Sequence, residues 1–261
     1  MKSQKKNLSF EKDLLRLPGQ SVSEELDELI DSKVNDYLFV IFASVLLILF
    51  SWISYFQEIK PNPYLMTFVG LVIGSFSGYK VLKLRKDVHN LKQGIKGERY
   101  VGQTLEELRA DGYRIFQDVL GDGFNIDHVL IGPAGIFVVE TKTWGNSASI
   151  KNASYDGRTL RLNNHPVPKN PIFQVQSSAR WLSEVLQKSI GTRWFVKPII
   201  ALPSKFIEPI VNQVLENEGV YMLNPKNIRS FLASYSGPNS LSEEQINQIS
   251  FHLSRLIASG R

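Results

Sequence analysis

The feature that most restricts how this chain can fold is a run of twenty uncharged residues, YLFVIFASVLLILFSWISYF, at positions 37–56. About 20 apolar residues in an α-helix are enough to cross the ~30 Å hydrocarbon core of a bilayer. A second apolar stretch, from Tyr64 to Tyr79 within a predicted span of about 64–82, follows a short connection. It carries Gly70, Gly74 and Gly78, a spacing that lets helices pack closely in lipid. The two stretches predict a transmembrane helical hairpin, and a buried core helix is the alternative for the first of them.

Lysine and arginine are distributed unevenly around the two apolar stretches. The connection between them contains only Lys60. Seven basic residues follow the second stretch: Lys80, Lys83, Arg85, Lys86, Lys92, Lys96 and Arg99. Because basic residues gather on the cytoplasmic side of a membrane, we expect a two-pass protein of the cell membrane with both termini in the cytoplasm. Residues 83–93 would be a juxtamembrane linker helix in contact with anionic lipid.

The segment before the hairpin, residues 1–36, is acidic and partly amphipathic, so a cleaved signal peptide is not expected. Within it, SVSE at 21–24 has the spacing of a capping box that opens a short helix. The chain has a net charge of +5 and no cysteine. The lack of cysteine excludes disulfides and thiolate metal sites. The positive charge favours a polyanionic partner, either nucleic acid or anionic lipid.

From residue 94 to residue 261 the pattern is typical of one α/β domain. Its first helix contains GIKGERYVGQTLEELRA, which begins at Gly94. The elements expected after it are a strand at 113–119, a hairpin at 125–144, a second hairpin with arms SIKN and TLRLNN around Asp156-Gly157, a helix from Asn170-Pro171, strands at 194–203 and in GVYML, and C-terminal helices from Asn224-Pro225.

The register of the hairpin at 125–144 follows from its turn. The sequence GPAG is a turn signal between two runs rich in β-branched and aromatic residues. Ile131 then pairs with Ile136, and counting outward places Asp127 directly opposite Glu140. Residues that face each other in this way have Cβ atoms about 4.5–5.5 Å apart. Two carboxylates are therefore expected side by side.

Lys142 shares the face of Asp127 and Glu140, because side chains alternate along a strand. Two adjacent carboxylates repel each other unless they share a proton or a cation. A hard divalent ion such as Mg²⁺, which prefers oxygen ligands, fits this arrangement. A solvated ion cluster on an exposed hairpin is the alternative that the spacing leaves open. His128 points to the opposite face and is interpreted as a core or interface residue rather than a ligand.

Glu98 lies on the apolar stripe of the first helix of the domain, three residues before Val101. Gly94 and Gly102 lie beside it and permit the close approach of other chain segments. An inward-facing carboxylate at this place is a candidate site residue. The alternative is a glutamate at a helix end that reaches water.

These motifs together resemble the nuclease-related domain (NERD) family, a branch of the restriction-endonuclease-like, or PD-(D/E)XK, superfamily that is also similar to archaeal Holliday-junction resolvases. The resemblance rests on GERYVG, NIDHVLIGPAGIFVVETKTWG and NPIFQVQ, and covers roughly residues 92–205. It implies an α/β fold with a mixed sheet flanked by helices, here preceded by the transmembrane hairpin.

The resemblance also implies roles for individual residues. Asp127 and Glu140 would bind Mg²⁺, or Mn²⁺ in its place, together with the backbone carbonyl of Thr141. Lys142 would position or deprotonate the attacking water.

Two further residues take roles from the same resemblance. Glu98 would act on the metal directly or through water, and Gln174 would orient the site or the substrate phosphate. One departure is Asn125, where the family often has an acidic residue, and this puts a second metal site in doubt.

Four basic residues on or near the second hairpin form a weak candidate footprint for nucleic acid: Lys151, Arg158, Arg161 and Lys169. Such residues are more often only solvated, and affinity from them would depend strongly on salt.

Together, these observations predict a membrane-anchored, Mg²⁺-dependent nuclease that hydrolyses phosphodiester bonds in DNA with a metal-activated water. The alternative is a nonenzymatic module that binds nucleic acid or a protein partner at the membrane.

Overall fold

The computed structural model of this chain describes residues 16–57, 62–144, 149–167, 169–203, 205–235, 237 and 240–258. It divides into two compact units. One consists of Met1–Gln20 together with Gly94–Arg261 and is called the sheet unit below. The other consists of Ser21–Gln93 and is called the hairpin unit. The sheet unit is therefore discontinuous in sequence, because it contains residues from both sides of the hairpin unit.

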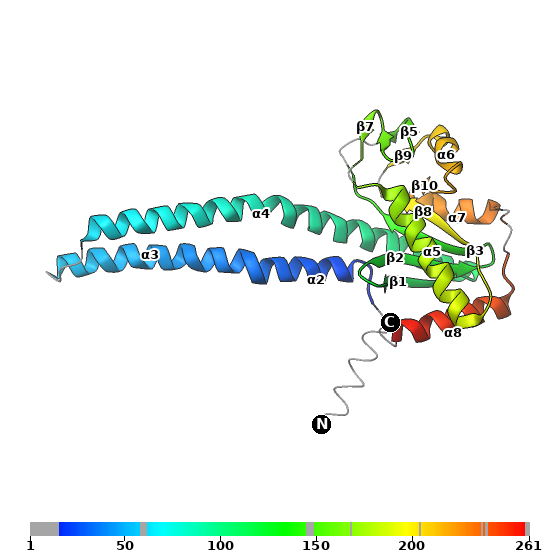
Figure 1. Ribbon diagram of the computed structural model, residues 1–261, viewed down its shortest axis with the longest axis horizontal. Helices are drawn as coiled ribbons and strands as arrows, with labels where there is room; N and C mark the ends of the chain where they lie inside the picture. The colour runs from blue at the N-terminus through cyan, green and yellow to red at the C-terminus, as the bar shows by residue number, and fades with distance from the viewer. Residues whose placement is uncertain are drawn as a thin grey trace, which may run out of the picture. The chain divides into compact units, whose positions relative to one another are not determined.

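The hairpin unit is made of long helices. Helix α2 (Gln20–Leu29) continues through a π-helical turn (Ile30–Val34) into α3 (Asn35–Phe56). The short helix expected near residues 21–24 therefore begins at Gln20 and does not end before the apolar stretch. Helix α4 (Pro63–Glu106) is likewise one 44-residue helix, where the sequence suggested a span, a linker helix and a domain helix (Figure 1).

Helices α3 and α4 pack against each other through small residues. A Cβ atom placed on Gly70 would lie 2.7 Å from Cγ1 of Ile48, so only glycine allows this approach. Gly74 faces Ser44 at ordinary contact distance, whereas a Cβ on Gly78 would meet nothing within 4 Å. The glycine pattern thus predicts the packing correctly at two of its three positions.

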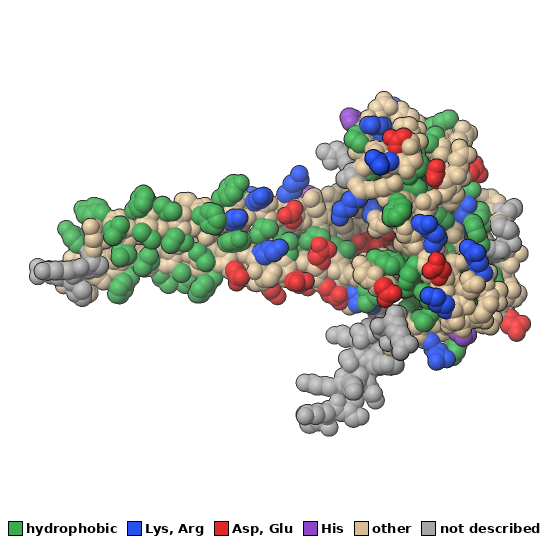
Figure 2. Space-filling view, in the orientation of Figure 1, with side chains coloured by type: hydrophobic (Ala, Val, Ile, Leu, Met, Phe, Trp, Pro, Cys, Tyr) green, Lys and Arg blue, Asp and Glu red, His purple; other side chains and the backbone are tan. Residues whose placement is uncertain are grey.

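The outer surfaces of these two helices are apolar. Hydrophobic side chains cover α3 and the N-terminal half of α4 in the space-filling view (Figure 2). Two stretches, Gln20–Phe56 and Pro63–Asp111, are long and apolar enough to cross a membrane, and little of their apolar windows is buried. Exposed apolar surface of this kind is unfavourable in water. These two stretches could span a membrane.

A five-stranded mixed sheet forms the centre of the sheet unit, as expected (Figure 1). Its strand order is β1 (Arg114–Leu120), β2 (Asn125–Gly132), β3 (Gly135–Thr141), β8 (Val196–Ala201) and β10 (Tyr221–Leu223). The first three strands are antiparallel, and β8 and β10 continue the sheet in parallel.

Helices cover both faces of this sheet. One core lies under α5 (Pro171–Ile190) and α8 (Glu243–Ala258), and α6 (Pro209–Glu216) adds to it. The other core lies under the end of α4, the 3-10 turn η2 (Glu107–Asp111) and α7 (Pro225–Ser234). Neighbouring strand residues alternate between the two cores, as the period of two requires.

Capping signals in the sequence locate two of these helices. The side chain of Asn170 accepts hydrogen bonds from the amides of Ile172 and Phe173 and is followed by Pro171. Asn224 accepts from the amide of Lys226 in the same way. Both predicted helix starts are confirmed.

The second hairpin is also present, but one of its expected arms is wrong. The strands that flank Asp156-Gly157 are β5 (Ala153–Tyr155) and β6 (Leu160–Leu162), and β7 (His165–Pro166) completes this small sheet. The expected first arm, SIKN, instead contributes β4 (Ser149–Ile150), which pairs with β9 (Phe206–Ile207). Two-residue strands leave too little periodicity to identify a partner.

Candidate active site

The β2–β3 hairpin has the register that its turn predicts. Ile131 pairs with Ile136, and the pairing is continuous to His128 and Val139. One step further along the same register, Asp127 lies opposite Glu140. The two residues are 7% and 4% exposed, so both carboxylates are buried. The solvated ion cluster that the spacing left open is excluded.

The end of β3 holds Asp127 in place. Its Oδ2 atom accepts a hydrogen bond from the backbone amide of Thr141 at 2.7 Å. In an extended strand the N–H and C=O of one residue point to the same neighbouring strand. The carbonyl of Thr141 therefore also points toward β2.

His128 lies on the opposite face and belongs to the core. It is fully buried, and its ring nitrogens contact Oε1 of Gln117 and, at 3.1 Å, Oγ1 of Thr141. Burial lowers the pKa of His128 to about 3, so the imidazole is neutral at pH 7. The expectation that His128 is a core residue is confirmed.

Lys142 and Gln174 both contact Glu140. Nζ of Lys142 lies 2.7 Å from Oε1 of Glu140 and 3.0 Å from Oε1 of Gln174. Nε2 of Gln174 donates to the same Glu140 oxygen at 2.7 Å. Gln174 reaches this position because the cap at Asn170 places it in the first turn of α5.

Glu98 faces inward from α4, as its place on the apolar stripe predicted. It is 7% exposed, and its Oε2 atom has no hydrogen-bond partner among the described residues. At this point α4 lies very close to the residues that follow β3. Gly97 makes this possible, because a Cβ on Gly97 would overlap Cγ2 of Thr143. Sequence reasoning singled out Gly94 and Gly102 and missed Gly97.

Burial and mutual repulsion govern the electrostatics of the three carboxylates. Burial, followed by the charges of Asp118 and Glu140, raises the pKa of Glu98 to about 7. Burial, followed by the charges of Glu140 and Glu98, raises the pKa of Asp127 well above its ordinary value. Burial also raises the pKa of Glu140, and Lys142 opposes this shift. The group favours either protons or a bound cation.

Asp118 is a fourth buried carboxylate that sequence reasoning missed. It is fully buried in β1 and has a φ of +49°, which is uncommon for any residue other than glycine. Counting the β1–β2 register from Gln117 opposite His128 would have placed Asp118 opposite Asp127. Nδ2 of Asn125 donates to Asp118 Oδ1 at 2.9 Å. Asn125, which stands where the family often has an acidic residue, therefore holds the Asp118 carboxylate.

The residues just before α2 complete the surroundings of Glu98 and Asp118. Nε of Arg16 lies 2.7 Å from Oδ2 of Asp118, and both side chains are largely buried. The backbone of Gly19 forms a hydrogen bond to the Glu98 carboxylate. Pro18 lies against α4, where a Cβ on Gly102 would overlap its ring. The segment from Arg16 to Gly19 therefore packs directly on the candidate site.

The comparison with protein families agrees with this geometry. Residues 93–203 match the family profile described as Nuclease-related domain. This segment is similar to a nuclease-related domain. The resemblance based on GERYVG, the β2–β3 hairpin and NPIFQVQ is confirmed, and it suggests a nuclease-like function. The Glu98, Asp127, Glu140, Lys142 and Gln174 cluster lies entirely within the nuclease-related domain.

The search of curated proteins returns no match. Among solved structures, the crystal structure of protein VC1899 from Vibrio cholerae aligns with a TM-score of 0.31 and 10% sequence identity. The alignment covers 95% of this chain and 59% of that chain, so this chain spans less than two thirds of that protein's length.

The carboxylates of the nuclease-related domain suit a hard divalent cation. Among the described residues, no three Asp, Glu or His side chains form a ready-made metal cluster. Mg²⁺ does not need one, because it is usually held by one or two carboxylates and keeps several waters. Asp127 and Glu140 supply two carboxylates on adjacent strands, and the unpartnered Oε2 of Glu98 is a further acceptor. The residues present fit the ion.

The four basic residues of the predicted footprint lie elsewhere on the surface. Lys151, Arg158, Arg161 and Lys169 are all exposed, on or beside the small β5–β6–β7 sheet. They are not brought into contact with the buried carboxylates. Their contribution to nucleic-acid binding stays a prediction.

Proposed function

We propose that this chain is a membrane-anchored, Mg²⁺-dependent nuclease that hydrolyses phosphodiester bonds in DNA. The observation that carries the proposal is that three buried carboxylates, Glu98, Asp127 and Glu140, come from a helix and two strands and are near enough to raise one another's pKa. Three like charges without enough counterions are costly to bury. A catalytic site for a divalent ion would explain why the three carboxylates are buried together. A binding module does not need buried carboxylates.

The metal would be held by Asp127, Glu140 and the carbonyl of Thr141, with Glu98 acting directly or through water. When bound, Mg²⁺ would lower the pKa of a coordinated water and offset negative charge on the phosphate. The amide of Thr141 would keep Asp127 Oδ2 oriented, since that hydrogen bond is already formed.

Lys142 would hold the attacking water or the charge that develops on the phosphate. Its ammonium group lies beside Glu140 at 2.7 Å and is the cation nearest to the carboxylates among the described contacts. A positive group fixed before the reaction stabilises developing charge without a reorganisation cost. Gln174 would orient Lys142 through the 3.0 Å hydrogen bond between them.

DNA binding would use exposed basic groups outside the catalytic cluster. Lys151, Arg158, Arg161 and Lys169 are the candidates, and each would contact the phosphate backbone rather than read bases. We therefore expect affinity to fall steeply with increasing salt.

The two apolar stretches would anchor this enzyme in the cell membrane. Both are long enough to span a bilayer. The excess of lysine and arginine after the second stretch would keep both termini and the nuclease-related domain in the cytoplasm, where nucleic acid is accessible. Residues 83–93 would contact anionic lipid at that surface.

The deciding experiment uses full-length protein in detergent with labelled single-stranded DNA, duplex DNA and RNA, in Mg²⁺, Mn²⁺ or EDTA. We expect DNA cleavage with either metal and none with EDTA. Glu140→Gln should abolish cleavage, whereas Glu184→Gln, which removes an exposed carboxylate on α5, should not. Binding without cleavage under every metal condition would instead support a nonenzymatic nucleic-acid-binding module.

A further inference from the structure

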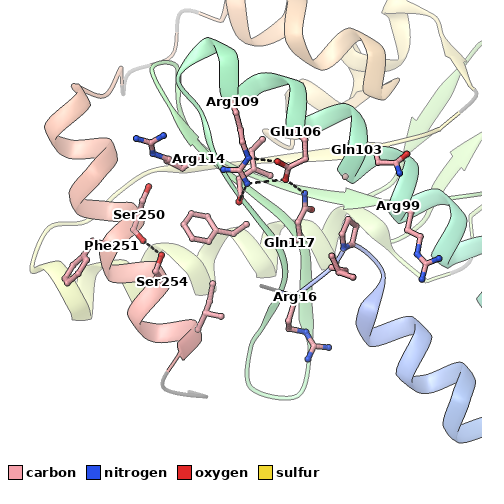
Figure 3. A pocket seen from close by; sticks show the side chains of 16 residues that line it. Arg16, Arg99, Gln103, Glu106, Arg109, Arg114, Gln117, Ser250, Phe251 and Ser254 are labelled. Carbon is pink, nitrogen blue, oxygen red and sulfur yellow. Dashed lines mark hydrogen bonds and ion pairs between the residues drawn. The ribbon is translucent and has the colours of Figure 1, made fainter. Parts of the chain in front are cut away.

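A cavity of about 910 Å³ lies beside the edge strand of the sheet unit. Its walls come from β1, the C-terminal part of α4, α8 and the residues just before α2 (Figure 3). All these segments belong to the sheet unit. Lys142 and Gln174 do not line it, so it is distinct from the candidate active site.

Four arginines line this cavity, and two of them have no acidic partner. The other two are held in ion pairs with carboxylates of the same unit. Arg99 forms no hydrogen bond or ion pair within the described part of the chain. Arg114 forms one contact, from Nη2 to Oδ1 of Asn247 on α8 at 3.3 Å. Free guanidinium groups bind phosphate oxygens in a bidentate manner. The cavity therefore offers two positions for an anion.

A buried hydroxyl group marks one of these positions. Ser250 on α8 lines the cavity and is 9% exposed, and its Oγ atom has no hydrogen-bond partner among the described residues. Asn247, one turn earlier on α8, brings Arg114 to the same side of the cavity. An unpartnered buried hydroxyl costs free energy that a ligand oxygen would recover once the Ser250 side chain rotates toward the cavity. Arg114 and Ser250 together fit a phosphate group.

A carboxylate, paired with Arg109, lies between the two arginines that have no acidic partner. The carboxylate of Glu106 accepts hydrogen bonds from Arg109 and, at 3.1 Å, from Nε2 of Gln117 (Figure 3). The hydrogen bond from Arg109 lowers the pKa of Glu106, so this group stays ionised. A carboxylate repels phosphate but accepts from the amino group of a base or from a sugar hydroxyl. The centre thus suits the nucleoside part of a nucleotide.

The volume and the aromatic lining of the cavity also suit a nucleoside. Phe116 and Phe251 both line the cavity, and Phe251 is 61% exposed. Exposed aromatic rings next to basic groups are how proteins without sequence preference stack the bases of single strands. A volume of about 910 Å³ is too large for a phosphate ion alone and lies at the upper end of small-molecule pockets.

We infer that this cavity binds a segment of unpaired nucleic-acid strand, with one phosphate on Arg114 and Ser250, another on Arg99, and a base or sugar facing Glu106. Figure 3 shows Arg99 and Arg114 on opposite sides of the cavity, so the two phosphates would belong to different nucleotides of the strand. The inference rests on the proposed function in one respect, namely that the strand belongs to the substrate of the nuclease-related domain.

The test measures binding of a fluorescent single-stranded oligodeoxynucleotide to full-length protein in detergent and EDTA, where cleavage does not occur. The variants are Arg114→Ala, Arg99→Ala and Ser250→Ala. The control is Arg255→Ala, which removes the same charge from an exposed position of α8 that does not line the cavity. Ser250→Ala should fold as the wild type does, because its hydroxyl has no partner to lose.

We expect Arg114→Ala to weaken oligonucleotide binding about tenfold, Arg99→Ala and Ser250→Ala several-fold, and Arg255→Ala less than twofold. Binding of blunt duplex DNA should not change. Losses no larger than that of Arg255→Ala would overturn the inference, as would an equal loss on duplex DNA. Displacement of the oligonucleotide by an equal concentration of a nucleoside monophosphate would also overturn it, because the ligand would then be a free nucleotide. Cleavage in Mg²⁺ is measured separately. The protein could therefore bind the strand in this cavity without cleaving DNA, or cleave DNA without binding the strand here.

Discussion

Nζ of Lys142 lies 2.7 Å from Oε1 of Glu140, and this same oxygen accepts from Gln174. One carboxylate oxygen thus takes hydrogen bonds from an ammonium group and an amide. In the proposed mechanism Glu140 would hold the ion, and Lys142 beside it would hold the attacking water or the charge that develops on the phosphate.

Lys142→Ala should reduce metal-dependent cleavage about 100-fold or more while nucleic-acid affinity stays within a few-fold. Loss of a group that stabilises transition-state charge costs orders of magnitude, whereas one phosphate contact among many changes affinity little. Initial cleavage rates and fluorescence anisotropy measure the two effects. Lys188→Ala, which alters an exposed lysine of α5 outside the candidate site and the footprint, should cleave nearly normally. A Lys142→Ala enzyme as fast as the wild type would refute the assigned role.

Asp127→Asn should remove the stabilisation of the protein by Mg²⁺. An ion that binds only the folded state raises its melting temperature, so loss of a ligand abolishes the rise. Without metal, the variant should be at least as stable as the wild type, because Asp127 and Glu140 repel each other and asparagine still accepts from the Thr141 amide. Thermal melts with Mg²⁺ and with EDTA test both points. Asp122→Asn, at an exposed position, should respond to Mg²⁺ as the wild type does.

Glu98→Gln should change how stability depends on pH in EDTA. The folded-state pKa of Glu98 is raised from 4.5 to about 7, so the folded state favours the protonated form. This contribution is complete below about pH 4.5 and is lost as pH rises through about 7. The loss is at most on the order of 3 kcal/mol. Between pH 5 and pH 7.5 the wild type should therefore lose more stability than Glu98→Gln.

The same Glu98→Gln variant should cleave more than tenfold more slowly than the wild type, a barrier increase of more than about 1.4 kcal/mol. Glu107→Gln, which alters an exposed glutamate of the following turn, is the control in both experiments. Parallel pH profiles for the wild type and Glu98→Gln would show that Glu98 does not titrate in this range. Normal cleavage by Glu98→Gln would remove the residue from the active site.

Arg16→Ala should destabilise the sheet unit by about 3–5 kcal/mol, because it leaves the buried carboxylate of Asp118 without its guanidinium partner. Asp118→Asn in the same chain should recover part of this loss, since the uncompensated charge is then gone. Denaturant unfolding of both single variants and the double variant measures the coupling. Arg99→Ala, which breaks no ion pair among the described residues, should have little effect. Additive losses would show that the pair contributes no coupling.

Single cysteines should report the membrane topology, because the native chain has none. Asn62→Cys, in the connection between the two apolar stretches, should react with a membrane-impermeant thiol reagent in intact cells. Ser240→Cys should not react unless the cells are opened. The reverse labelling pattern would invert the proposed orientation.

Local sequence signals predicted much of the candidate site. The GPAG turn gave the β2–β3 register and so placed Asp127 and Glu140 together. The cap at Asn170 placed Gln174 in the first turn of α5, and the apolar stripe of α4 turned Glu98 inward. Each of these inferences needs only a turn type, a cap or a helical period, which act over a few residues.

Other parts depend on contacts between residues far apart in the sequence. Arg16 and Asp118 are separated by 102 positions, and no local pattern predicts their pairing. The continuity of α4 was missed because its composition changes from apolar to charged, although the helical backbone tolerates that change. The partner of β4 was missed because a two-residue strand carries almost no periodicity.

The packing of Gly19 makes the hairpin unit an insertion rather than an N-terminal addition. A Cβ on Gly19 would lie 3.4 Å from Cα of Ile95 and 3.5 Å from Cβ of Glu98, so the chain leaves the sheet unit and returns to it at nearly the same point. A soluble version cut near residue 93 would lose Arg16 and Gly19. Replacing residues 21–93 with a short glycine linker would keep both and join two ends that already touch.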